Sequence, residues 1–207
     1  MLVQIYEISS PEGARALAEL GVDHIGVLVG DGSFPREQSI DRARIIFSAI
    51  PSSCKGVALS LSADLRLIEH IVAELKPSIL HLGASTDLLT PAMVQGLKTR
   101  CGGFALMRSV PVCGNESLAI ARSYDGIADM LLLDSHRPGD VQIGALGVTH
   151  SWQIDRTIAE NVNVPVIIAG GLGPDNVTPL ERRGRPASTR NRGRTKTMAA
   201  TQKTCKR

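Results

Sequence analysis

The segment Val166–Val177, VIIAGGLGPDNV, contains three local signals in a fixed order. The aliphatic run from Val164 to Ala169 predicts a buried parallel strand. Gly170 and Gly171 follow it, and adjacent glycines allow positive φ angles and a close approach of the backbone to a ligand. The next residues, Pro-Asp-Asn, predict a helix N-terminus, whose unpaired N–H groups and positive dipole end favour a phosphate. We therefore expect a strand, a phosphate-binding turn and a helix, with an ordinary strand–helix turn as the alternative.

Apolar runs alternate with helical patterns along the rest of the chain. The expected strands are Val3–Tyr6, His24–Val29, Gly56–Ser60, Ser78–Leu82, Phe104–Val110, Asp129–Asp134 and Val164–Ala169. The expected helices are Ala14–Leu20, Ser39–Ile50, Ala63–Leu75, Pro91–Thr99, Asn115–Arg122, Asp155–Asn161 and one beginning at Pro174. Strands that alternate with helices in this way predict βαβ units and a parallel sheet.

The position of the glycine turn distinguishes two parallel folds. A doubly wound sheet would place a glycine-rich turn after its first strand, but the turn Glu7–Ser10 contains no glycine. The glycine turn instead follows the seventh strand, where barrels bind phosphate. We therefore predict an α/β fold of the (β/α)8 TIM-barrel type, with about seven βα units over residues 1–180.

The balance of charged residues differs between residues 1–180, which form the body of the chain, and residues 181–207 at its end. Residues 1–180 hold 13 Lys/Arg and 19 Asp/Glu, whereas residues 181–207 hold 10 Lys/Arg and one acid. High charge and few large apolar residues predict a basic, disordered tail. We therefore expect the eighth βα unit to be missing or replaced, which would leave unpaired edges on strands one and seven.

Composition narrows the classes of function. No apolar run approaches the length of a membrane span, so no membrane partner is expected. The first residues lack the basic region of a signal peptide. The cysteines show no metal-ligand spacing, so no metal site is expected; they are Cys54, Cys101, Cys113 and Cys205. These features predict a cytoplasmic protein.

Reactive side chains of a parallel barrel gather at the carboxyl ends of its strands. Asp134 directly follows the run Met130–Leu133 and is placed to act as a general acid or base, or as a cap. Glu7 is a candidate base at the end of strand one, where Tyr6 either donates a hydrogen bond or only packs on its neighbours. Arg36, after strand two, either clamps a carboxylate or is solvated.

Two further features lie at strand or loop positions. The glycines of the loop Gly144–Trp152 predict a shaped active-site loop, which we expect Trp152 to anchor by packing. His81 lies within the fourth strand, where we expect a satisfied core histidine rather than a catalyst.

Several of these motifs resemble phosphoribosylanthranilate isomerase. The resemblance covers about residues 2–180 and lies in strand one with Ile8, Phe34–Arg36, Leu131–Ser135, Gly144–Trp152 and Ala169–Val177. It implies a (β/α)8 barrel of tryptophan biosynthesis. Such an enzyme performs an Amadori rearrangement, an aldose–ketose isomerisation, on a small phosphorylated substrate with no cofactor. A homodimer is a further expectation that the sequence leaves open.

The resemblance also implies roles for individual residues. Asp134 matches the general acid that protonates the ring oxygen, and Arg36 matches the arginine that holds the anthranilate. Gly170, Gly171 and Asn176 match the phosphate-side loop and helix start.

The chain departs from the family pattern at the end of strand one. The family ends this strand with Lys-Ile-Cys-Gly and uses the cysteine as general base, but this chain has Gln-Ile-Tyr6-Glu7. A phenol with a pKa near 10 is a poor base, so Glu7 or another group must serve. The family motif Gln-Leu-His-Gly after strand four is also changed, to Leu80–Gly83. The alternative is therefore a barrel homologue with a different phosphorylated ligand or no catalytic activity.

Two origins of the tail are open. A natural basic arm would bind nucleic acid, but the body has no basic stripe or stacking aromatics, so we do not expect that partner. The other origin is a frameshift near residues 178–184. The codons of Pro186–Lys206, read out of frame, permit Gly-Ile-Asp-Ser-Glu, which resembles the missing eighth strand of the family. We favour the frameshift, and the coding DNA decides between the two.

Overall fold

The computed structural model describes residues 2–114, 116–137, 139–144, 146 and 149–172, and the backbone of residues 199–203. Strands and helices alternate from β1 to β7, as the sequence predicts. The strands are β1 Leu2–Tyr6, β2 His24–Leu28, β3 Lys55–Ser60, β4 Ile79–Leu82, β5 Ala105–Val112, β6 Met130–Ser135, β7 Val166–Ile168 and β8 Ala199–Lys203. The helices are α1 Pro11–Glu19, α2 Ile40–Phe47, α3 Leu65–Leu75, α4 Pro91–Arg100, α5 Glu116–Tyr124 and α6 Trp152–Asn161.

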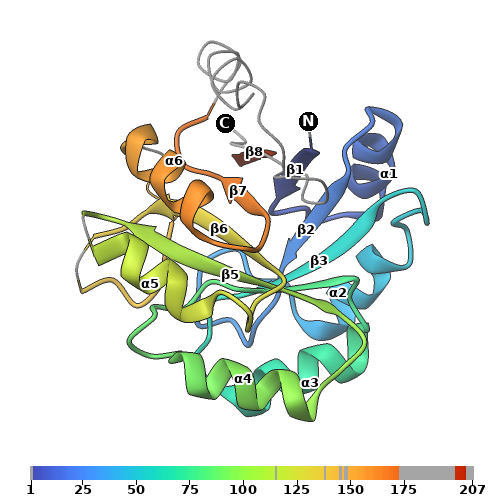
Figure 1. The fold of residues 1–207 in the computed structure, drawn as a ribbon. Coiled ribbons are helices and arrows are strands. Elements are labelled where there is room, and N and C mark those ends of the chain that lie inside the picture. The colour runs from blue at the N-terminus through green and yellow to red at the C-terminus, as the bar shows by residue number, and fades with distance from the viewer. Residues whose placement is uncertain are drawn as a thin grey trace.

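The strands form one closed parallel barrel in the order β1 to β8, with the helices around its outside (Figure 1). Each strand pairs with its neighbours in the chain, and β8 closes the ring against β1. The predicted TIM-barrel type is therefore confirmed.

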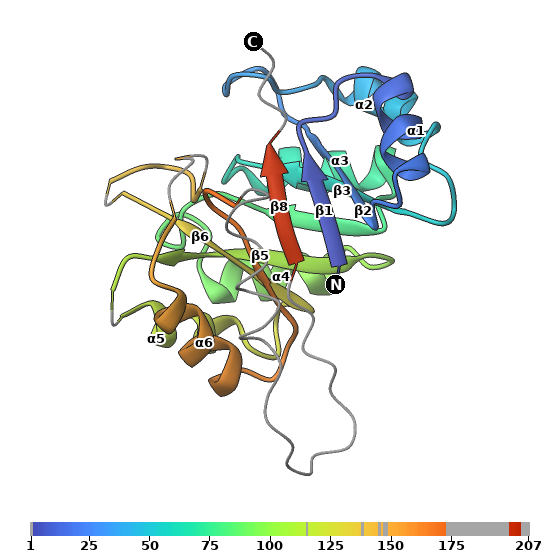
Figure 2. The same cartoon turned by 90° about the horizontal axis from the view of Figure 1, so that it is seen from above.

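The eighth strand corrects one expectation. Ala199–Lys203 pairs in parallel with all five residues of β1, and Ala200 pairs with Ile168 of β7 (Figure 2). The prediction of unpaired edges on strands one and seven is wrong, because a segment of the predicted tail occupies the eighth position. The rest of the predicted tail, and the helix expected from Pro174, lie outside the described residues.

Local sequence explains where the helices begin. Ser10 precedes Pro11 at the start of α1, and its side chain accepts a hydrogen bond from the Gly13 N–H. Ser39, Asp64 and Thr90 cap α2, α3 and α4 in the same way. No helix in the described part of the chain has the length and apolar composition that crossing a membrane requires.

Side chains alternate between the two faces of each strand. Leu106 and Val110 of β5 pack outward against the helices, whereas Met107 lies in a cluster inside the barrel. The same lumen also contains buried polar side chains from neighbouring strands, which are Gln4, His24, His81 and Ser109. The barrel interior is therefore a packed core that includes several polar side chains.

Removal of residues 199–207 should destabilise the barrel, because β1 and β7 would lose the strand that lies between them. We expect a fall in Tm of at least about 5 °C and aggregation on heating. Removal of residues 204–207 alone, which keeps β8, is the control and should change Tm little. Equal Tm values for the two truncated proteins, measured by circular dichroism, would contradict this role of β8.

Candidate active site

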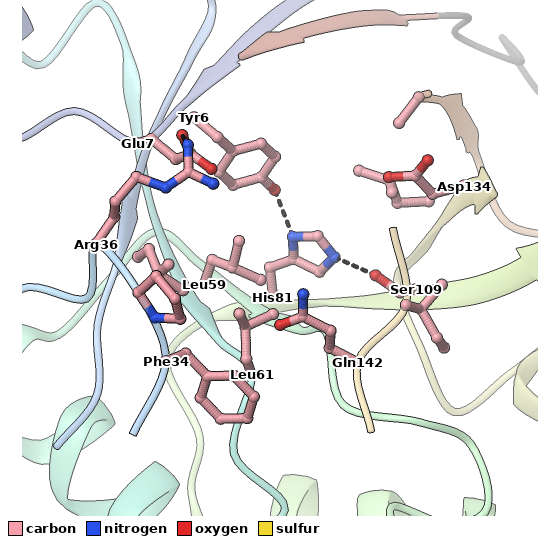
Figure 3. Close-up of a pocket in the computed structure, with 15 residues that line it drawn as sticks. Tyr6, Glu7, Phe34, Arg36, Leu59, Leu61, His81, Ser109, Asp134 and Gln142 are labelled. Carbon is pink, nitrogen blue, oxygen red and sulfur yellow. Dashed lines mark hydrogen bonds and ion pairs between the residues drawn. The ribbon is translucent and has the colours of Figure 1, made fainter. Parts of the chain in front are cut away.

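A cavity of about 120 Å³ opens at the carboxyl ends of the strands (Figure 3). Its charged lining residues are Glu7, Arg36 and Asp134, all three of which the sequence singled out. The other lining residues are Tyr6, Leu28, Phe34, Pro35, Leu59, Leu61, His81, Ser109, Leu132, Gln142, Ile143 and Ala169. Barrel closure thus brings together residues that lie more than a hundred positions apart in the chain.

Asp134 lies at the end of β6 and is 8% exposed. Its Oδ1 accepts hydrogen bonds from the backbone N–H of Ser135, at 2.8 Å, and from the Ser135 hydroxyl, at 3.3 Å. Gly144 passes directly over the carboxylate with φ 90°, and a Cβ at this position would overlap Oδ2. A glycine is therefore required where the following loop crosses the acid.

Glu7 and Arg36 form an ion pair at the cavity mouth. Arg36 Nη1 donates to Glu7 Oε2 at 2.6 Å, and the Glu7 side chain is only 9% exposed. Both residues have left-handed backbones, with φ 65° for Glu7 and 69° for Arg36. Such a conformation costs a non-glycine residue about 1–3 kcal/mol, so the chain accepts strain at both members of this pair.

The loop that carries Arg36 is organised by its neighbour, Glu37. The Glu37 carboxylate accepts hydrogen bonds from the N–H groups of Gly32, at 2.9 Å, and Phe34, at 3.2 Å. It also packs against Gly30, where a Cβ would overlap it. Glu37 therefore holds the loop in a shape that presents Arg36 to the cavity.

Tyr6 lies inside the barrel and is uncharged. Its hydroxyl contacts His81 Nδ1 at 2.5 Å, and its ring packs against Gly26 of β2. Burial, with a contribution from the charge of Asp134, raises the pKa of Tyr6 well above its ordinary value. Tyr6 is thus a neutral phenol that both packs and forms a hydrogen bond, and it is unsuited to act as a base.

His81 is a satisfied core histidine, as expected, and it also lines the cavity. Nε2 contacts Ser109 Oγ at 2.8 Å, so both ring nitrogens have partners. Burial and the charge of Arg108 lower the pKa of His81 to about 3, which keeps the ring neutral. The place of His81 in the site was not predicted from the sequence. Leu80 and Leu82 both pack outward, so strand alternation could have shown that His81 faces the lumen.

Three further lining residues were not foreseen. Ser109 lies two residues beyond Met107 on the lumen face of β5. Gln142 and Ile143 belong to a segment that pairs with the end of β4, where the Ile143 N–H donates to the Gly83 carbonyl. The alternation of side chains along β5 could have identified Ser109. The pairing of the segment that carries Gln142 and Ile143 could not be predicted, because no local sequence pattern indicates it.

The glycine turn after β7 has the backbone expected of it. Gly170 and Gly171 have φ 86° and 59°, and the preceding Ala169 lines the cavity. Asn176 lies outside the described residues, so phosphate binding by this turn stays a prediction. Trp152 packs against Ile168 and Leu172, so its expected packing is confirmed, whereas its role in anchoring the loop stays a prediction.

Within the described residues, no group of three His, Cys, Asp or Glu side chains is arranged to hold a metal ion.

Known proteins are similar to this chain in sequence and in fold. N-(5'-phosphoribosyl)anthranilate isomerase of Methanocella arvoryzae is 33% identical over 184 residues, which are 89% of this chain and 84% of that protein. The chain belongs to the phosphoribosylanthranilate isomerase family. No family model matches it.

Solved phosphoribosylanthranilate isomerases have the same fold at lower sequence identity. A structure of monomers made from the dimeric Thermotoga maritima enzyme has a TM-score of 0.73 and 19% identity, covering 98% of this chain and 87% of that one. A complex with reduced 1-(o-carboxyphenylamino)-1-deoxyribulose 5-phosphate has a TM-score of 0.70 and 19% identity, covering 99% and 88%. At this identity the likeness concerns the fold alone.

The departure from the phosphoribosylanthranilate isomerase pattern at the end of strand one lies in this cavity. Tyr6 stands at the position of the family cysteine, and Gly26 provides the space for its ring. Glu7 stands at the position of the family glycine and keeps a backbone that glycine adopts without strain.

Gly26→Ala should destabilise the protein by about 1–3 kcal/mol, because the new methyl group would overlap the Tyr6 ring. In a Tyr6→Cys background the ring is gone, so the same change should cost at least about 1 kcal/mol less. Urea unfolding of the four proteins measures this coupling. Equal costs in the two backgrounds would show that the ring does not require the glycine.

The free energy of unfolding should decrease as the pH is lowered below about 6.5, the pKa of a histidine in the unfolded chain. Burial lowers the pKa of His81 to about 3 and that of His24 to about 4, so the folded protein resists protonation that the unfolded chain accepts. Each histidine therefore contributes a slope of up to about 1.4 kcal/mol per pH unit between pH 6.5 and 4.

His81→Asn should reduce this slope, whereas His70→Gln at an exposed position should leave it unchanged. Urea unfolding of the three proteins at pH 7, 6 and 5 provides the comparison. The same slope in His81→Asn as in the parent would contradict a neutral His81 in the folded protein.

Proposed function

We propose that this chain catalyses the aldose–ketose isomerisation of N-(5'-phosphoribosyl)anthranilate in tryptophan biosynthesis. The observation that carries the proposal is the meeting of Asp134, Glu7 and Arg36 in one cavity, beside the Gly170–Gly171 turn. The ligand of the solved relative bears a carboxylate, an open-chain sugar and a phosphate. We assign these three groups to Arg36, to the two carboxylates and to the glycine turn with Asn176.

Asp134 serves as the general acid of the reaction. It donates a proton to the ribose ring oxygen as the bond from this oxygen to C1 breaks, which leaves an iminium ion at C1. A base then removes the proton from C2, which gives an enolamine with a C1–C2 double bond. This enolamine becomes the C2 ketone by taking up a proton at C1 and losing the proton of its C2 hydroxyl. The product is an isomer of the substrate, so the reaction needs no oxidant or reductant.

Glu7 serves as the base in this proposal. Of the groups that line the cavity, Tyr6 has a raised pKa and His81 a lowered one, so neither accepts a proton readily. Glu7 is the second carboxylate of the cavity, and Arg36 orients it. A guanidinium has five N–H donors, so Arg36 has capacity to hold a substrate carboxylate while Nη1 remains on Glu7.

The proposal also includes a substrate class, a compartment and an oligomeric state. The substrate is a small phosphorylated molecule, the enzyme acts in the cytoplasm, and two copies of the chain form a homodimer, as in the dimeric relative.

An alternative is a barrel homologue with a different phosphorylated ligand or no activity. The Glu7–Arg36 ion pair favours it, because Glu7 places a negative charge beside the arginine that would receive the substrate carboxylate. Turnover of phosphoribosylanthranilate distinguishes the two functions.

Asp134→Asn should lower kcat by about 10²–10⁴-fold, because the acid is lost while the shape of the cavity is kept. Arg36→Ala should raise KM by about 10–100-fold, because it removes a charged hydrogen bond to the carboxylate. It should also lower kcat, because Glu7 loses the partner that orients it. Steady-state kinetics with phosphoribosylanthranilate measure these effects. Arg44→Ala is the matched control, since Arg44 pairs with Asp41 and Glu74 away from the cavity.

The same assay applied to a frame-restored gene, with complementation of a tryptophan auxotroph, tests whether the end of this chain impairs activity. Absence of turnover in both folded proteins would reject the isomerase and favour the alternative.

A further inference from the structure

A line of hydrogen bonds crosses the barrel lumen and ends at the cavity. His24 Nδ1 contacts Gln4 Oε1 at 2.9 Å, and Gln4 Nε2 donates to the Tyr6 hydroxyl at 3.0 Å. The Tyr6 hydroxyl contacts His81 Nδ1, and His81 Nε2 contacts Ser109 Oγ at 2.8 Å. Figure 3 shows the last two contacts as dashed lines between the labelled side chains.

All five side chains are buried, with exposed fractions of at most 4%. Both histidines are neutral, because burial lowers the pKa of His24 to about 4 and that of His81 to about 3. A neutral imidazole has one N–H donor and one acceptor nitrogen. His81, which has partners at both ring nitrogens, therefore donates from one and accepts at the other. His24 contacts the Gln4 carbonyl oxygen through Nδ1, so it donates there.

The direction of the whole line follows from the Gln4 amide. Its NH2 group donates to Tyr6 Oη, so the single phenol proton is available for His81 Nδ1. Met107 Sδ, at 3.6 Å from the hydroxyl, is a weaker acceptor. With Nδ1 accepting, His81 carries its proton on Nε2 and donates it to Ser109 Oγ.

Ser109 is left with a proton of its own. Its oxygen is the acceptor for His81, and within the described part of the chain no other group accepts from its hydroxyl. Ser109 lines the cavity from β5, next to β6, on which Asp134 lies (Figure 3). The hydroxyl proton is therefore free to reach a ligand in that cavity.

We infer that Ser109 is a substrate-binding residue whose hydroxyl donates a hydrogen bond to a sugar oxygen of the bound phosphorylated sugar. Tyr6 and His81 act through it as positioning residues, because they hold its oxygen as an acceptor and leave its proton for the ligand. The nature of the ligand rests on the proposed function, whereas the proton arrangement does not.

The opposite proton arrangement is a definite alternative. With the Gln4 amide turned over, Tyr6 would donate to Gln4, His81 would carry its proton on Nδ1, and Ser109 would donate to His81 Nε2. Ser109 would then have no proton for a ligand. The two arrangements differ in one observable, which is the ring nitrogen of His81 that carries the proton.

Nitrogen-15 NMR of the full chain labelled at histidine measures this observable without a substrate. At pH 7 we expect His81 to be protonated on Nε2 and His24 on Nδ1, with the His81 signal assigned by its loss in His81→Asn. Tyr6→Phe removes the donor to Nδ1 and should lower the Nε2-protonated fraction of His81. A proton on Nδ1 of His81 in the parent protein would overturn the inference.

Binding of reduced 1-(o-carboxyphenylamino)-1-deoxyribulose 5-phosphate supplies the second test. Ser109→Ala should weaken its Kd about tenfold, and Ser109→Thr, which keeps the hydroxyl, should restore most of the affinity. Ser60→Ala is the matched control, because Ser60 is equally buried at the end of β3 but does not line the cavity.

The two tests separate the inference from the proposed function. Absence of turnover with an intact Ser109 effect on analogue binding would reject the isomerase and keep the Ser109 assignment. Unchanged binding in Ser109→Ala would overturn the assignment even in an active enzyme.

Discussion

Closure of the parallel sheet into a barrel is the constraint on which the site depends. Every strand from β1 to β8 lies between two others, and all of their carboxyl ends meet at one rim. Glu7, at the end of β1, and Asp134, in β6, therefore face one cavity although the chain separates them widely. The carboxylate pair is a consequence of the closed ring, because an open sheet would hold β1 and β6 apart.

The barrel lumen imposes a second condition, which is that its polar groups satisfy one another. Buried amide, phenol and imidazole groups without partners would cost several kcal/mol, so a complete line of hydrogen bonds is required. Tyr6 is central to this line, since it fills the space above Gly26 and joins Gln4 to His81. The same burial makes Tyr6 and His81 unsuited to act as bases.

Backbone strain is concentrated beside the cavity. The non-glycine residues with positive φ in the described part of the chain are Glu7, Arg36 and Lys76. Lys76 ends helix α3, where a left-handed residue is an ordinary cap. Glu7 and Arg36 instead meet each other at the cavity mouth, and strained residues that cluster in this way are typical of functional sites.

Much of the fold and part of the site could be predicted from local sequence. Apolar periodicity, Ser and Thr caps and the Gly170–Gly171 turn act within a few residues, so they located seven strands and identified the barrel. Asp134, Glu7 and Arg36 were found because strand ends carry the chemistry of such folds. Strand β8 was not predicted, because Ala199–Lys203 has no apolar pattern and is held by its pairing with β1.

The sequence by itself therefore determined the type of fold and the rim positions of the charged residues, because these depend on local patterns. Only the tertiary structure decided that Glu7 pairs with Arg36 and that Tyr6 contacts His81, and that His81 in turn contacts Ser109. These contacts depend on strand register and on closure of the ring, which join residues from different βα units. The protonation of the buried groups follows from the same closure, since burial inside the ring disfavours their charged forms.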